Sequence, residues 1–132
     1  MKDYLRLWAE GWPRQESLLL ESPVSVIGVR QRSFFPRAEF AKIQLTVRPA
    51  QSLEVVDDVV EKSDLEKLGV GWPDCVIFGL LDVFMLAEPR PLYKVRVVLE
   101  AVWYHDVDST WQAFRHAGRD AGRQVLEIIS RR

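Results

Sequence analysis

The sequence predicts an α+β protein, a two-layer sandwich in which two helices cover one face of a four-stranded sheet. Apolar and polar residues alternate over 41–47 and 92–104, as they do in strands with one buried face. Apolar residues recur every three to four positions over 73–88 and again after Ser109, as they do along one face of a helix. The order strand, strand, strand, helix, strand, helix then gives one sheet with its helices on one side.

Each expected strand has its own sequence pattern. Val24 to Val29 and the weaker Leu53 to Val60 are short candidates, whereas Ala41 to Val47 alternates strictly and ends at Pro49, which lacks the N–H that a ladder needs. Leu92 to Tyr104 is long and rich in β-branched and aromatic residues. One face of this strand is wholly apolar and is expected in the core beneath Phe84 and Phe114, and its members are Val95, Val97, Leu99, Ala101 and Trp103.

Both expected helices have sequence signals at their ends. The first begins near Trp72-Pro73-Asp74, where proline suits the first turn, and ends before Pro89 and Pro91. The second has Ser109-Thr110-Trp111-Gln112 as a capping box, with Asp108 as a competing cap. Small residues keep its middle slim and predict a close approach to the sheet: Ala117, Gly118, Ala121 and Gly122. Arginines spaced four apart share its outward face: Arg115, Arg119 and Arg123.

The composition fits one domain with its own core. The chain has 132 residues, of which 48% are hydrophobic, and its single cysteine, Cys75, excludes an internal disulfide. Residues 22–132 are expected to form the domain, and residues 1–21 an N-terminal extension whose conformation the sequence leaves open. Charged residues interrupt the first twenty positions, so neither a signal peptide nor a membrane span is expected there, and the expected location is the cytoplasm.

Charge is unevenly spread along the chain. The formal net charge of −1 argues against a broadly basic nucleic-acid binder. Two segments, however, are basic: residues 30–48 hold five basic side chains and one acidic, and residues 109–132 hold five basic and two acidic. The segment between them is acidic, since residues 49–91 hold three basic side chains and nine acidic. If the two basic segments fold side by side, one face of the domain is positive and the opposite face negative. The alternative is that the charged segments are ordinary solvent-exposed surfaces with no separation of charge between faces.

The motifs of nucleotide and metal chemistry are missing from the sequence. Its glycines form neither a phosphate-binding loop nor a dinucleotide fingerprint, so no nucleotide and no cofactor is expected. His105, Asp106 and Asp108 could supply metal ligands, but a turn entering a helix explains both aspartates as caps, and no metal is expected. Cys75 lies among apolar neighbours, and no acid–base pair stands at a credible spacing, so the chain is not expected to be an enzyme.

The two histidines differ in position. His116 falls near the edge of the apolar stripe of the second helix, where a packed, non-catalytic imidazole is expected. His105 stands at the junction between the long strand and that helix, where loops present functional side chains. A strand-end residue without a role is the alternative for His105.

The residues around this junction resemble a known family. Tyr104-His105-Asp106-Val107-Asp108-Ser109, followed by Trp111, Ala113-Phe114 and Ala117, is similar to the tip and following helix of domain IV of bacterial translation elongation factor G. The similarity extends back to Arg37-Ala38-Glu39-Phe40, at the position of the family's glycine-bearing tip loop, and covers roughly residues 22–130.

The resemblance implies the ribosomal protein S5 domain 2-like fold with a left-handed β-α-β crossover. It also implies a non-enzymatic, translation-factor-like domain that binds the ribosome or structured RNA. The family's tip histidine falls on His105, and Arg37 with the neighbouring Arg32 and Arg30 would meet phosphates or unstacked bases. The sequence departs from the family at Phe34-Phe35-Pro36-Arg37-Ala38, which replaces the tip glycines, and it carries no counterpart of the factor's GTP-binding domain.

A protein-interaction or assembly module, which keeps the fold without RNA binding, is the second hypothesis. Aromatic residues that look exposed in the sequence could form an apolar patch for another protein: Trp8, Trp12, Phe34 and Phe35. No membrane partner is expected under either hypothesis.

Overall fold

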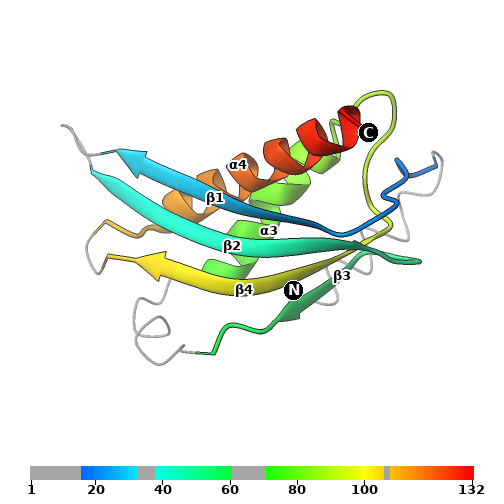
Figure 1. Cartoon of the computed structure of the whole chain (residues 1–132). Coiled ribbons are helices and arrows are strands. Elements are labelled where there is room, and N and C mark those ends of the chain that lie inside the picture. The colour runs from blue at the N-terminus through cyan, green and yellow to red at the C-terminus, as the bar shows by residue number, and fades with distance from the viewer. Residues whose placement is uncertain (1–15, 33–37, 61–70, 106–107) are drawn as a thin grey trace.

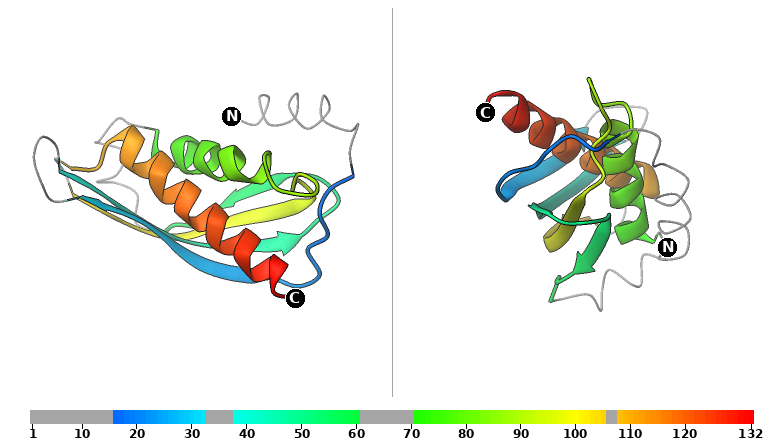
Figure 2. Two further views of the ribbon diagram at one scale, coloured as in Figure 1. Left: turned by 90° about the horizontal axis from the view of Figure 1, so that it is seen from above. Right: turned by 90° about the vertical axis from the view of Figure 1, so that its right-hand side faces the viewer.

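The computed structural model describes residues 16–32, 38–60, 71–105 and 108–132. Along these residues run β1 (Val24–Arg32), β2 (Glu39–Pro49), β3 (Glu54–Asp57), α3 (Trp72–Phe84), β4 (Val95–Tyr104) and α4 (Trp111–Ser130). The strands form a four-stranded sheet in the order β1-β2-β4-β3, and both helices lie on one side of it (Figure 1, Figure 2). The predicted α+β two-layer sandwich and its element order are confirmed.

A left-handed crossover connects β3 to β4. The two strands are parallel neighbours, with Glu54 opposite Arg96, whereas the β1–β2 and β2–β4 pairs are antiparallel. From β3, at the lower edge of the sheet in Figure 1, the chain passes through α3 behind the sheet and returns as β4 beside β3. This path is left-handed, whereas most such units are right-handed. The element order and the handedness are those of the ribosomal protein S5 domain 2-like fold.

The core lies between the sheet and the two helices. Alternate side chains of the strands fill it from one side, and the apolar stripes of α3 and α4 fill it from the other. Its largest fully buried side chains are Ile43, Leu45 and Val47 of β2, Val95 and Leu99 of β4, Val76, Ile77, Leu80 and Phe84 of α3, Leu92, and Phe114 of α4. Burial of each of these side chains stabilises the fold by about 1.5–3 kcal/mol. The predicted core positions Val95, Val97, Leu99, Phe84 and Phe114 are confirmed.

A β-bulge interrupts β4 about halfway along its length. Gln44 of β2 lies opposite Ala101, but the next residue, Leu45, lies opposite Leu99. Glu100 is therefore an additional residue in β4. Such a bulge shifts the alternation of the side chains beyond it by one position.

The bulge places Trp103 on the face of the sheet that no described helix covers. Val102 and Tyr104 pack against the core, whereas Trp103 between them is 41% exposed. Ala101 lies on the same uncovered face, because it pairs with Gln44 rather than with a core residue of β2. The prediction that Trp103 and Ala101 face the core is therefore wrong. We call the uncovered side of the sheet, which faces the viewer in Figure 1, the open face.

Glycines let α4 approach both the sheet and α3 closely. A Cβ atom on Gly28 of β1 would come within 2.2 Å of the carbonyl oxygen of Ala117 in α4. A Cβ atom on Gly118 would lie 2.2 Å from the carbonyl oxygen of Val76 in α3. No side chain other than hydrogen fits at either contact without moving backbone. The predicted close approach of α4 to the sheet is confirmed.

The helix ends differ from the sequence signals by a few residues. α3 ends at Phe84, several residues before the prolines expected to stop it. The N-cap of α4 is Thr110, whose hydroxyl oxygen accepts a hydrogen bond from the Ala113 N–H at 3.2 Å. The predicted caps, Ser109 and Asp108, are wrong, because Ser109 is buried and its hydroxyl bonds to the backbone of Phe40 and His105 instead. Neither described helix is long and apolar enough to cross a membrane.

Residues 16–20, at the end of the expected extension, run beside the segment that precedes β4. The Leu18 N–H donates to the Pro91 carbonyl oxygen at 2.7 Å, and the Ser17 hydroxyl oxygen accepts from the Tyr93 N–H at 2.9 Å. Leu20 is almost completely buried. This part of the extension therefore packs on the domain, and residues 1–15 lie outside the described residues.

Candidate nucleic-acid interface

Three strands and α4 meet at one end of the sheet. β1 ends there at Arg32, β2 begins at Glu39, β4 ends at Tyr104 and α4 begins at Trp111, at the left in Figure 1. His105 directly follows β4 and is exposed at this end. We call it the tip end.

The buried hydroxyl of Ser109 fixes the backbone on both sides of His105. It accepts a hydrogen bond from the His105 N–H at 2.8 Å and donates one to the Phe40 carbonyl oxygen at 2.6 Å. The Ser109 N–H donates to the His105 carbonyl oxygen at 3.0 Å, and the Phe40 N–H to the Asp108 carbonyl oxygen at 3.1 Å. Ser109 is only 4% exposed. The exposed imidazole therefore stands on a well-anchored backbone.

Four side chains form a two-by-two cluster on the open face at the tip end, which we call the open-face quartet. Phe40 and Lys42 come from β2, Trp103 comes from β4, and His105 directly follows β4. The rings of Phe40 and His105 meet edge to face, with centroids 4.4 Å apart. The Lys42 Nζ lies 4.8 Å from the centroid of the Trp103 ring, and the two residues are paired in the register of the sheet.

The sequence pattern identified only His105 of this quartet. Trp103 is assigned to the core because the alternation of the strand is extended through Glu100, where the bulge breaks it. Phe40 and Lys42 belong to the candidate site because Trp103 lies on the same face of the sheet as these two residues. The adjacent apolar residues Val102 and Trp103, one on each face, are the sequence signal that could have indicated a bulge.

Two of the predicted site arginines, Arg30 and Arg32, do not share a face with His105. Arg30 and Arg32 alternate with Val29 and so point to the helix-covered side. Arg30 is paired there with the buried carboxylate of Glu39, at 2.6 Å between Nε and Oε2. Arg32 belongs to the tip end but is separated from His105 by β2. The predicted Arg37 lies outside the described residues.

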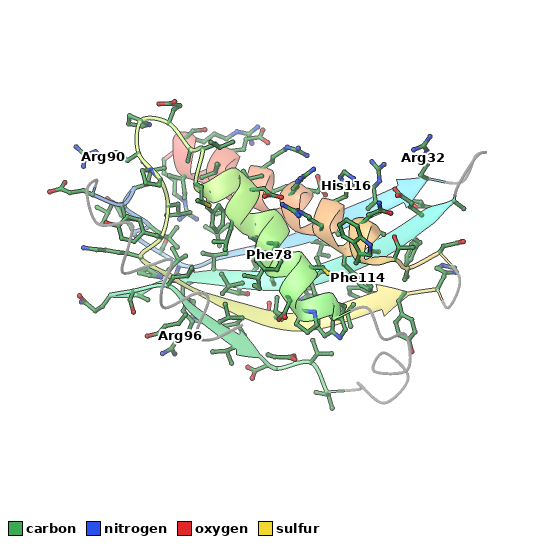
Figure 3. The ribbon with its side chains drawn as sticks, turned by 180° about the vertical axis from the view of Figure 1, so that it is seen from behind. Arg32, Phe78, Arg90, Arg96, Phe114 and His116 are labelled. Carbon is green, nitrogen blue, oxygen red and sulfur yellow. The ribbon has the colours of Figure 1, made fainter. Side chains whose placement is uncertain are left out.

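His116 lies beside Arg30 on the helix-covered side of β1. Figure 3 shows His116 on α4 and Arg32 near the same end of the molecule. Burial lowers the pKa of His116, and the nearby guanidinium groups of Arg30 and Arg119 lower it further. The half-buried imidazole is therefore mostly neutral at pH 7.

An ion-pair cluster joins α3 to the outward face of α4. Both oxygens of Asp82 accept hydrogen bonds from Arg115, each at 2.8 Å, and Arg119 donates a third at 2.8 Å. Hydrogen bonding from Arg115 and Arg119 lowers the pKa of Asp82 against the opposing effect of burial. The basic segment of α4 thus lies against the acidic middle segment. Arg30 of the first basic segment and Arg119 of the second both lie near His116, so the two basic segments fold side by side, and Asp82 neutralises part of the second.

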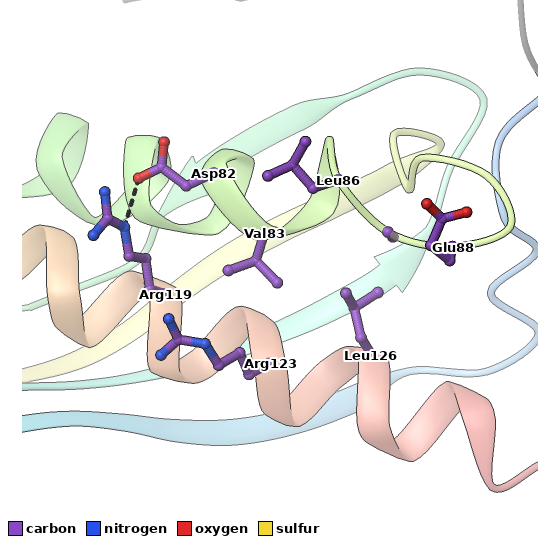
Figure 4. Close-up of a pocket in the computed structure, with 8 residues that line it drawn as sticks. Asp82, Val83, Leu86, Glu88, Arg119, Arg123 and Leu126 are labelled. Atoms are coloured by element: carbon purple, nitrogen blue, oxygen red, sulfur yellow. Dashed lines mark hydrogen bonds and ion pairs between the residues drawn. The ribbon is translucent and has the colours of Figure 1, made fainter.

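A shallow groove runs between the end of α3 and α4. It has a volume of about 620 Å³ and lies next to the Asp82–Arg119 pair (Figure 4). Its lining mixes apolar side chains, Val83, Leu86 and Leu126, with Arg123 and Glu88 at the rim. Leu86 is 80% exposed. The groove therefore presents apolar surface between charges of both signs.

Metal-binding and thiol chemistry find little support in the described part of the chain. No group of three His, Cys, Asp or Glu side chains there is placed to hold a metal ion. Asp106, a member of the candidate ligand set in the sequence, lies outside the described residues. Burial raises the pKa of the Cys75 thiol, which disfavours the reactive thiolate.

The described residues define a two-layer α+β domain with a left-handed crossover, whose tip end carries aromatic side chains and Lys42 on the open face. A protein from Thermus thermophilus, known from its crystal structure, shares this fold. It matches 83% of the present chain with a TM-score of 0.72 and 15% sequence identity, and the chain spans 16% of its length. No family model and no curated protein matches the sequence. At this identity the likeness shows the fold alone.

Proposed function

We propose that this chain is a non-enzymatic, translation-factor-like domain that binds the ribosome or structured RNA through its tip end. The observation that carries the proposal is the exposed His105, anchored at both its N–H and its carbonyl oxygen by Ser109. A side chain held in this way at the end of a rigid sheet can contact a large partner without losing much conformational freedom.

The sequence resemblance to domain IV of elongation factor G also supports the tip end as the binding site. The tip histidine of that family corresponds to His105, and its other tip loop to residues 33–39, which contain Arg37. Imidazole can stack on an unpaired base or donate a hydrogen bond, and a guanidinium group binds phosphate through its planar fork. The proposal includes a cytoplasmic location, where ribosomes are found.

Co-sedimentation with ribosomes over a salt series tests the proposal. His105→Ala should weaken binding about 5- to 10-fold without unfolding the domain, because an exposed side chain contributes little to the core. Arg37→Glu should weaken binding further and flatten its salt dependence, because phosphate contacts release counterions. Lys94→Glu, the same charge reversal on an exposed residue at the opposite end of β4, is the matched control. Equal sedimentation of all four proteins contradicts the proposal.

The groove between α3 and α4 supports a second candidate function, a protein-interaction module. Leu86, Val83 and Leu126 form apolar surface there with Arg123 and Glu88 nearby, as in the core and rim of a small interface. The aromatic residues that suggest such a module in the sequence, at positions 8, 12, 34 and 35, lie outside the described residues. Leu86→Arg separates the two functions. It leaves ribosome sedimentation unchanged if the tip end binds, and abolishes it if the groove does.

A further inference from the structure

The open-face quartet has the chemistry of a base-stacking surface. Phe40, Trp103 and His105 supply aromatic rings, and Lys42 supplies a cation, from two neighbouring strands. Bases of a single-stranded nucleic acid stack on such rings with little regard to sequence, because every base has a π-face. A sheet face that carries aromatic side chains is one of the recurring ways in which proteins bind single-stranded RNA.

The spacing of the quartet provides two stacking positions. Lys42 lies opposite Trp103 in the sheet register, and Phe40 and His105 occupy the next positions of the same face toward the tip end. Positions two residues apart on a strand are about 7 Å apart. Lys42 Nζ lies over the Trp103 ring in the free protein. When Lys42 moves from the ring to a phosphate, one base can stack on Trp103 and the next on the Phe40–His105 pair, with that phosphate between them.

The charge of this half of the open face suits an anionic chain. Its other described members, between the tip end and the bulge, are neutral: Val29, Gln31, Gln44 and Ala101. The first carboxylate along the face is that of Glu100, which accepts a hydrogen bond from the Thr46 hydroxyl at 2.6 Å. Among the strand positions of this face, a nucleic-acid strand laid over Lys42 therefore crosses no acidic residue before the bulge. Asp108, whose carbonyl oxygen accepts a hydrogen bond from the Phe40 N–H, lies beyond the strands at the tip end.

Two structural features hold the rings in place before any ligand arrives. The bulge at Glu100 turns Trp103 to the open face, and Ser109 fixes the backbone of Phe40 and of His105. Bulges next to binding sites commonly re-aim a side chain in this way. A preorganised surface loses little conformational entropy on binding.

We propose that the open-face quartet binds single-stranded RNA, with one base on Trp103, a second on the Phe40–His105 pair, and Lys42 on the intervening phosphate. This inference rests on the proposed function, since it shares His105, and it specifies both the strandedness of the RNA and the face that receives it. The helix side of the tip end, with the Arg30–Glu39 pair, takes no part.

Titration of a fluorescently labelled oligouridylate with the whole chain, followed by fluorescence anisotropy, tests the inference. Trp103→Ala should weaken binding about tenfold, through the loss of one stacked base. Trp103→Phe should keep most of the affinity, because a phenyl ring still stacks. Leu19→Ala is the control, since Leu19 is an exposed apolar residue that lies away from the tip end, beside the segment that precedes β4. It should leave the affinity unchanged, and thermal melting of each variant separates lost binding from lost folding.

Three results overturn the inference: an unchanged affinity of Trp103→Ala for oligouridylate, tighter binding of a blunt RNA duplex than of the single strand, or no oligouridylate binding at low salt. In the last case, an effect of Trp103→Ala on ribosome sedimentation would mean that the open face docks a protein. The two experiments distinguish a failure of the inference from a failure of the proposed function. Ribosome binding that depends on His105 but not on Trp103 removes only the inference, whereas oligouridylate binding that depends on Trp103 without ribosome binding removes only the proposed function.

Discussion

Ser109 shows how one buried hydroxyl can position an exposed functional side chain. It links the start of β2 to the end of β4 and leaves α4 to be capped by Thr110. The sequence pattern favours Ser109 as part of a capping box, because a serine before a helix most often caps it. The tertiary partner at Phe40, far away in the sequence, decides otherwise.

Ser109→Ala should lower the free energy of unfolding by about 1–3 kcal/mol. The substitution leaves the His105 N–H and the Phe40 carbonyl oxygen without the hydroxyl that satisfies them. Urea unfolding followed by circular dichroism measures the change. Ser130→Ala removes an exposed hydroxyl near the end of α4 and should change stability by less than about 0.5 kcal/mol. Equal stability of the two variants would mean that the Ser109 hydroxyl is not structural.

His116 should make the stability of the domain fall as the pH drops below about 6.5, the ordinary pKa of a histidine. Its folded pKa lies below the ordinary value of about 6.5, so the unfolded chain binds the proton more readily. The contribution is complete above the unfolded pKa and is lost as the pH falls toward the folded pKa. The groups around it are the cations Arg30, Arg119 and Arg123 and the acid Glu39. His116→Gln should flatten the pH dependence of the melting temperature, and an unchanged slope would contradict this account.

At the scale of elements, the bulge in β4 marks where the sequence ceased to predict the structure. Strand and helix positions follow from periodicity, which depends only on neighbouring residues. Glu100 is an extra residue in β4, and the pairing with β2 is what shows where the alternation shifts. Predicting the open-face quartet required that pairing, whereas the exposure of His105 required only its position at a strand end.

The packing of α3 on α4 predicts different outcomes for two neighbouring glycines. Gly118→Ala should destabilise the domain by about 1–3 kcal/mol, because its Cβ would lie 2.2 Å from the Val76 carbonyl oxygen and force the helices apart. Gly122→Ala is the control, since its Cβ would meet the side chain of Val83 at 3.2 Å. The better helix propensity of alanine, about 1 kcal/mol, offsets that milder contact. Thermal unfolding of both variants measures the difference, and equal losses would contradict the packing described.

At the scale of the whole molecule, ion pairs neutralise part of the charge pattern of the sequence. Asp82, from the acidic middle of the chain, neutralises much of the arginine row of α4 through Arg115 and Arg119. Arg30 is paired with Glu39 on the helix-covered side. Segment charges could not predict this, because they do not show which side chains the fold brings together. The open face at the tip end differs from the ion-paired helix side, because aromatic and uncharged side chains surround Lys42 there.

Ultraviolet cross-linking of the chain to ribosomes, with mass-spectrometric identification of the RNA-linked peptide, tests the central claim most directly. Aromatic rings stacked on bases cross-link efficiently, so the account predicts linkage in the peptide that contains Trp103 and His105, and its loss in Trp103→Ala. Linkage confined to α4 residues beside the groove, such as Arg123 and Leu126, would contradict the assignment of RNA binding to the open face of the tip end.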